Sequence, residues 1–215
     1  MAKSTSETIN WIEGLIIKTF GLTKILEGFP LLDAWLDVSG ELPDEEKQRL
    51  EKWRLKLLKN VGTWNDETLK MKFIANIIEL VDYDTDEFEG TFDAEMKGVV
   101  QGQKLSVVAD YALAKATLDY METPYFYFHE YKPRKRSKDP IAQLLLAMLI
   151  TQSKTERKYP LYGCAVFGEL WFFMVLDDKT YSVSSGIVST NKDGLRRILL
   201  ILRKFKYILT NELSI

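Results

Sequence analysis

Residues 125–132 read Tyr-Phe-Tyr-Phe-His-Glu-Tyr-Lys, an aromatic run that ends in charged side chains. Aromatic residues favour β-strands, so this run predicts one. Residues two apart in a strand project from the same face, which puts Glu130 and Lys132 on the face of Phe126 and Phe128. A strand that ends in this way indicates either a carboxylate and an ammonium that meet a substrate, or an ordinary ion pair where the strand reaches water.

A second predicted strand holds Asp110 among small and apolar residues, such as Ser106 and Ala112. A carboxylate in such apolar surroundings must form an ion pair or bind a cation. If the two strands are neighbours, Asp110 and Glu130 converge on one hard cation and leave Lys132 beside it. That arrangement is chemically suited to the hydrolysis of a phosphodiester.

The rest of the chain predicts an α/β protein. Apolar spacing, caps and turn residues place helices and strands along the sequence. The expected helices cover residues 9–32, 43–60, 66–81, 139–153 and 191–209, and the expected strands cover 92–100, 105–114, 125–132, 162–167, 170–176 and 180–185. We therefore expect a helical N-terminal extension, residues 1–62, and an α/β core, residues 63–215, that together form one compact unit.

Composition excludes several classes of function. The chain has 215 residues and a formal net charge of −2, so it is no polycation that coats nucleic acid or anionic lipid along its whole length. With one cysteine, Cys164, and one histidine, His129, it has neither an intrachain disulfide nor a cysteine-based zinc cluster. Its apolar runs are too short for a membrane span and its start is unlike a signal peptide, so we expect a cytoplasmic protein without membrane contact.

The motif residues Asp110 and then Glu130-Tyr131-Lys132 resemble the PD-(D/E)XK nuclease superfamily. The resemblance covers residues 65–167. Within it, the sequences of residues 126–133, 139–143 and 160–163 are similar to those of a branch of small proteins in that superfamily. It implies a restriction-endonuclease-like fold, which is a mixed central sheet flanked by helices. It also implies that Asp110 and Glu130 bind Mg²⁺ or Mn²⁺ together with the carbonyl of Tyr131, while Lys132 positions or activates the attacking water.

Other motif positions match the superfamily in part. Ala109 stands where the motif has its proline, and Gln143 matches a glutamine that some of these nucleases place in the following helix, although Ala147 replaces the tyrosine of that pattern. The superfamily often adds an acid from the first core helix, and Asp66 or Glu67 occupies that region. Either residue is equally well explained as a favourable charge at a helix start.

Basic residues follow the motif directly, at Arg134, Lys135, Arg136 and Lys138. They predict a loop that grips phosphate groups, or else a solvated loop that aids solubility.

Three functions remain open from the sequence. The first is a metal-dependent nuclease acting on DNA rather than RNA, as a homodimer or within a larger assembly. The second is a non-catalytic nucleic-acid-binding or accessory module of a restriction, repair or defence system. The third is an interaction protein in which the motif is a coincidence.

Overall fold

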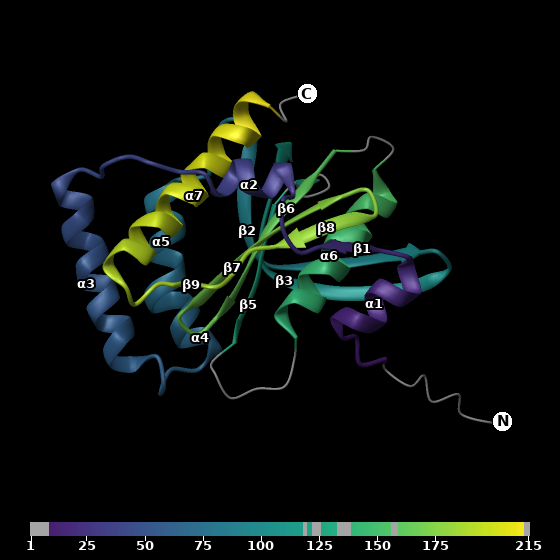
Figure 1. Cartoon of the computed structure of the whole chain (residues 1–215), viewed down its shortest axis with the longest axis horizontal. Coiled ribbons are helices and arrows are strands. Elements are labelled where there is room, and N and C mark those ends of the chain that lie inside the picture. The colour runs from purple at the N-terminus through teal and green to yellow at the C-terminus, as the bar shows by residue number, and fades with distance from the viewer. Residues whose placement is uncertain (1–8, 118–119, 122–125, 133–138, 156–158, 213–215) are drawn as a thin grey trace.

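A mixed β-sheet flanked by helices on both faces forms the centre of the molecule (Figure 1). The computed structural model describes residues 9–117, 120–121, 126–132, 139–155 and 159–212, with residues 116–117, 120–121 and 126–132 described in their backbone only. The expected α/β class is confirmed. The strands are β1 (Thr23–Ile25), β2 (Phe88–Val100), β3 (Gln103–Thr117), β4 (Tyr120–Met121), β5 (Phe126–Lys132), β6 (Leu161–Phe167), β7 (Leu170–Asp177), β8 (Thr180–Val183) and β9 (Ile187–Val188).

The strands follow the order β1-β8-β7-β6-β5-β3-β2, with β4 paired to β3 and β9 paired to β7. The pairs β1–β8 and β5–β6 are parallel, and the others are antiparallel. The helix α6 lies between β5 and β6 in the chain, which gives this parallel pair the long crossover that it needs.

Two hydrophobic clusters lie on opposite faces of the sheet. One packs between the sheet and the helices α2, α3, α5 and α7, and it includes the fully buried Trp35 and Trp171. The other packs beneath α1 and α6. The helices are α1 (Glu13–Phe20), α2 (Pro30–Leu36), α3 (Asp44–Asn60), α4 (Asp66–Leu69), the π-helical turn η1 (Lys70–Ile74), α5 (Ala75–Val81), α6 (Pro140–Lys154) and α7 (Lys192–Asn211).

Most of the elements expected from local sequence are present. The predicted helix over residues 66–81 is observed as α4, η1 and α5 in succession, and the side chain of its cap, Asn65, accepts a hydrogen bond from the Thr68 amide. Asp139 caps α6 and Pro140 opens it, as expected. The basic helix α7 buries its apolar side on the sheet, and Cys164 is fully buried.

The N-terminal segment differs from the expected run of helix. Thr23–Ile25 forms the edge strand β1 and pairs with β8, after Gly21 ends α1 in the left-handed conformation. The Ser182 hydroxyl also donates a hydrogen bond to the Ile25 carbonyl. Tertiary pairing therefore decides the conformation of a three-residue segment that is too short to be predicted as a strand from its own sequence.

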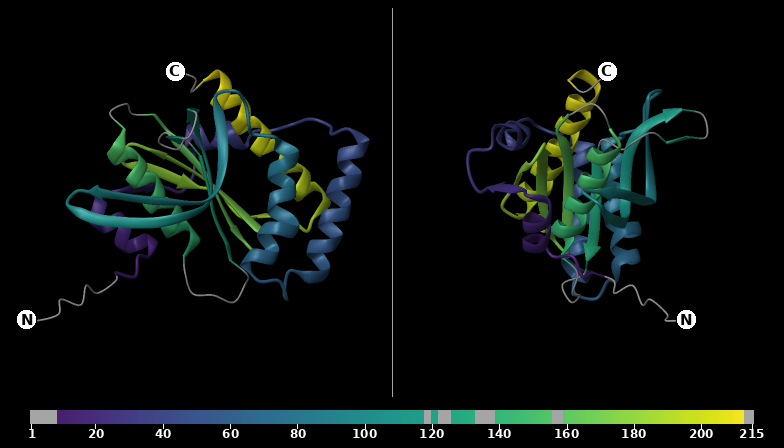
Figure 2. Two further views of the ribbon diagram at one scale, coloured as in Figure 1. Left: turned by 180° about the vertical axis from the view of Figure 1, so that it is seen from behind. Right: turned by 90° about the vertical axis from the view of Figure 1, so that its right-hand side faces the viewer.

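The β2–β3 hairpin is longer than the sequence predicts and reaches across the molecule (Figure 2). Its turn uses positive φ angles at Gln101 and Gly102, as two-residue hairpin turns require. The half nearest the turn packs on α6, where a Cβ on Gly98 would lie 3.0 Å from Ile150. The other half supplies Phe88 to the cluster on the opposite face. The hairpin thus changes the face it buries part-way along its length.

None of the described helices combines the length and the apolarity that a membrane span needs.

Candidate functional site

Asp110 lies in β3, next to the strand that carries the rest of the motif. The register of the antiparallel pair β3–β5 places Tyr111 opposite Phe128. Asp110 immediately precedes Tyr111, and Glu130 follows Phe128 by two residues. The expectation that the two strands are neighbours is confirmed, and Asp110 lies beside the end of β5 that holds the motif.

The end of β5 is irregular where the motif begins. His129 pairs with Ala165 and Lys132 pairs with Phe167, so β5 has one residue more than β6 between these two rungs. Extra residues of this kind re-aim side chains and interrupt strand alternation. The prediction that Glu130 and Lys132 share the face of Phe128 rests on regular alternation and stays a prediction here. The side chains of Glu130, Tyr131 and Lys132 lie outside the described part of the structure.

Asp110 lies beside a cation, as its sequence context requires. In the described structure this cation is the ammonium of Lys70. The Nζ atom of Lys70 lies 3.7 Å from Oδ1 of Asp110. The Asp110 side chain is 25% exposed, so it is accessible from solvent on one side. The Lys70 ammonium is thus an ionic neighbour of Asp110, whose side chain stays partly exposed.

Lys70 belongs to a cluster with two further acids. Its Nζ donates a hydrogen bond of 2.7 Å to Asp93 and lies 3.6 Å from Oε1 of Glu67. Burial alone would lower the pKa of Lys70, but the hydrogen bond to Asp93 and the attraction of Asp110 and Glu67 outweigh it, so the pKa of Lys70 is raised. Lys70 is therefore a stably charged ammonium. We call these four residues, Glu67, Lys70, Asp93 and Asp110, the Lys70 cluster.

Asp93 reaches this cluster through an unusual backbone conformation. It occupies the rung of the β2–β3 hairpin directly opposite Asp110, between the pairs Phe92–Tyr111 and Ala94–Ala109. Its φ of 55° is left-handed, a conformation that aspartate tolerates better than most residues. This rung is also where the hairpin changes the face it buries. The two aspartates thus mark a local break in the sheet and not a regular stretch of strand.

Sequence reasoning missed Lys70 and Asp93. Lys70 precedes Phe73 by three residues and Ile74 by four, which places it on the inward stripe of its helix. A lysine on such a stripe needs an acidic partner, just as the buried-looking Asp110 needs a cation. These opposite charges at two inward positions were the signal that could have paired Lys70 with Asp110. Asp93 gave no comparable signal, because a left-handed residue inside a strand follows no local pattern.

The helix start that was expected to supply an extra acid lies against the motif strand. The helix α4 contacts β5 (Figure 1). Its Glu67 belongs to the Lys70 cluster. Asp66 is the first residue of α4, whose capping hydrogen bond comes from Asn65. The structure thus brings Glu67 toward Asp110, while the role of Asp66 stays a prediction.

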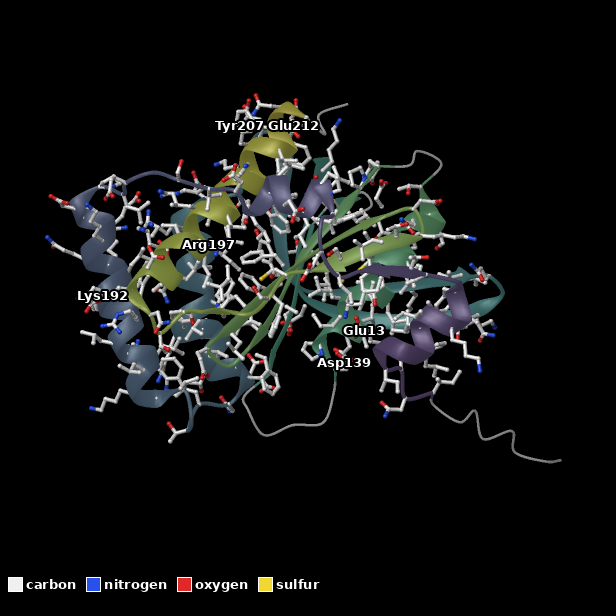
Figure 3. The ribbon with its side chains drawn as sticks, viewed as in Figure 1. Glu13, Asp139, Lys192, Arg197, Tyr207 and Glu212 are labelled. Carbon is white, nitrogen blue, oxygen red and sulfur yellow. The ribbon has the colours of Figure 1, made fainter. Side chains whose placement is uncertain are left out.

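Gln143 occupies the first turn of α6 and is half-buried. Because α6 packs on the opposite face of the sheet from η1, the structure does not place Gln143 in the Lys70 cluster. The start of α6 is fixed by Asp139, which accepts hydrogen bonds from the Ile141 and Ala142 amides and from the Glu13 amide of α1 (Figure 3). The basic residues Arg134, Lys135, Arg136 and Lys138 lie in a segment outside the described residues.

The donors of the motif suit a hard cation, because Asp110 and Glu130 are carboxylates and Tyr131 offers a carbonyl. Among the described side chains, however, no group of three acids, histidines or cysteines gathers as a ligand set. The acids near Asp110 surround the Lys70 ammonium instead. Burial raises the pKa of Cys164, so this thiol is not activated as a ligand or a nucleophile.

Comparison with models of known protein families gives no match, and no curated protein matches the sequence.

Proposed function

We propose that the chain is a metal-dependent nuclease that hydrolyses phosphodiester bonds in DNA, in preference to RNA, with a restriction-endonuclease-like fold. The observation that carries the proposal is the position of Asp110 in β3 beside the end of β5, where Glu130, Tyr131 and Lys132 follow in order. Further support comes from the mixed sheet and from α4, which lies against the same strand.

Asp110 and Glu130, with the carbonyl of Tyr131, would hold Mg²⁺ or Mn²⁺. A divalent ion in such a site polarises a phosphate oxygen and lowers the pKa of a bound water. Lys132 would orient the attacking water and offset the negative charge that develops on the phosphate. A side chain that is partly open to solvent, as Asp110 is, suits a site that must admit a phosphodiester.

The substrate would be gripped by the basic segment that joins β5 to α6. Arg134, Lys135, Arg136 and Lys138 follow Lys132 within six residues, so the chain length between them and Lys132 is at most about 20 Å. Contacts between such side chains and phosphates release counterions, and binding should therefore weaken as salt rises.

A second function is favoured by one observation. The ammonium of Lys70 already lies beside Asp110, and a permanently bound cation could replace the metal altogether. In that case the chain would be a non-catalytic nucleic-acid-binding or accessory module that keeps the nuclease fold.

A plasmid-nicking assay with Mg²⁺ or Mn²⁺ distinguishes the two functions, with single-stranded DNA and RNA as further substrates. We expect the wild type to cleave DNA, and the variants Asp110→Ala and Lys132→Ala to lose cleavage. The matched controls are Glu79→Ala and Lys72→Ala, which remove exposed charges from the helical segment that contains α4 and η1. DNA binding without cleavage would support the accessory module, and equal cleavage by the wild type and both motif variants would show that the activity belongs to a contaminant.

A further inference from the structure

Lys70 is an unusual residue for the interior of this protein. Its side chain is 5% exposed, whereas its partners Asp93 and Glu67 are 66% and 75% exposed. A surface ion pair would leave the lysine in solvent together with its acids. Here the cation approaches the acids from the protein side, and the acids face outward.

Lys70 lies among buried residues of its helical segment. Leu69, Phe73 and Ile74 are buried against the sheet, and Lys70 is the first residue of the π-helical turn between α4 and α5. Such single π-turns are frequent at functional sites. The ammonium lies 2.7 Å from Asp93 and 3.7 Å from Asp110.

The Lys70 ammonium is not shared equally among the carboxylates of the Lys70 cluster. The hydrogen bond of 2.7 Å ties Lys70 mainly to Asp93, while the distance of 3.7 Å to Asp110 is beyond a hydrogen bond. Asp93 could therefore keep the ammonium while Asp110 takes another cation.

The distances also limit how far apart the two cations could be. A metal ligated by Oδ1 of Asp110 lies about 2.0–2.6 Å from that oxygen, and hence no more than about 6 Å from Nζ of Lys70. A divalent and a monovalent charge at that separation repel each other enough to weaken binding about tenfold even at the dielectric constant of water.

We propose that the Lys70 ammonium competes with the divalent metal for Asp110 and thereby sets the metal affinity of the site. This inference rests on the proposed function, because it takes Asp110 as a metal ligand. Lys70 is a positioning residue in this account: it acts on the metal through Asp110 and touches no substrate.

Calorimetric titration of the full chain with MnCl₂ tests the competition directly. The variants Lys70→Met and Lys70→Gln remove the charge, and Lys70→Arg keeps it. The matched control is Lys72→Met, which removes a lysine charge from an exposed position in the same turn. We expect the two neutral variants to bind Mn²⁺ about tenfold more tightly than the wild type. Lys70→Arg and Lys72→Met should bind as the wild type does.

Thermal unfolding gives a second reading that does not depend on activity. Without Lys70, Asp93 and Asp110 repel each other across one rung, so we expect a lower melting temperature without metal and a larger rise with MnCl₂ than in the wild type. Failure of both neutral variants to fold even with MnCl₂ would overturn the competition, because the ammonium would then be a structural requirement.

The outcomes separate this inference from the proposed function. If the neutral variants bind Mn²⁺ and the wild type does not, the competition is supported and the nuclease proposal is overturned. Wild-type binding and cleavage, with unchanged Mn²⁺ affinity in Lys70→Met, leaves the nuclease in place and overturns the competition. Weaker binding by the neutral variants also overturns it, because Lys70 would then assist the metal.

Discussion

Removal of the Asp139 side chain should destabilise the protein by about 2 kcal/mol. Its Oδ1 accepts hydrogen bonds of 3.0 and 3.2 Å from the Ile141 and Ala142 amides at the start of α6. Loss of such a cap costs about 1 kcal/mol. Its Oδ2 accepts a hydrogen bond of 3.2 Å from the Glu13 amide of α1, and loss of this part-buried bond adds about 1 kcal/mol.

Urea denaturation of the wild type and of Asp139→Ala measures this difference, with Asp139→Asn as the control. Asparagine keeps one oxygen for the cap, so we expect Asp139→Asn to lose less than half as much stability as Asp139→Ala. A loss below about 0.5 kcal/mol in Asp139→Ala would refute the reasoning, since the cap and the tie to α1 would then contribute almost nothing. The position matters for the proposed function because Asp139 caps α6, the helix that comes next after the motif strand in the chain.

Two further predictions concern the core and pH. Trp35 is fully buried and donates a hydrogen bond to the Ile201 carbonyl, so Trp35→Ala should lower the free energy of unfolding by about 3–5 kcal/mol in the same urea assay; a loss under about 1 kcal/mol would contradict this packing. Glu46 forms two 2.8 Å hydrogen bonds with Arg203, and this pairing, opposed by burial, lowers the pKa of Glu46. The stabilisation is therefore present above the ordinary glutamate pKa and is lost as pH falls through the lowered one, so Glu46→Gln should be about 1 kcal/mol less stable than the wild type at pH 7 and nearly equal to it near pH 3. Parallel stability curves for the two proteins across that range would contradict this prediction.

Much of the fold could be predicted because the signals are local. Asn65 and Asp139 are helix caps in the sequence as in the structure, and Gly102 marks the hairpin turn. The apolar stripe from Phe73 to Val81 identifies the buried side of its helix. Each of these features depends on residues close together in the chain, which is why single-sequence reasoning finds them.

The features that were missed depend on contacts between distant residues. The strand β1 exists because β8 lies beside it, and the irregularity of β5 is defined only against β6. Lys70 and Asp110 are 40 residues apart in the chain, and their meeting follows from the packing of η1 on the hairpin. The residue types alone show that Lys70 and Asp110 each need a partner of opposite charge. They do not show that the two residues are partners.

An anomalous difference map from crystals grown with MnCl₂ tests the central claim most directly. The account predicts a manganese peak between β3 and the end of β5, within ligand distance of Asp110 and Glu130, and no such peak in crystals of Asp110→Ala. A structure in which Lys70 stays against Asp110 and no manganese binds between these strands would contradict the metal-dependent nuclease.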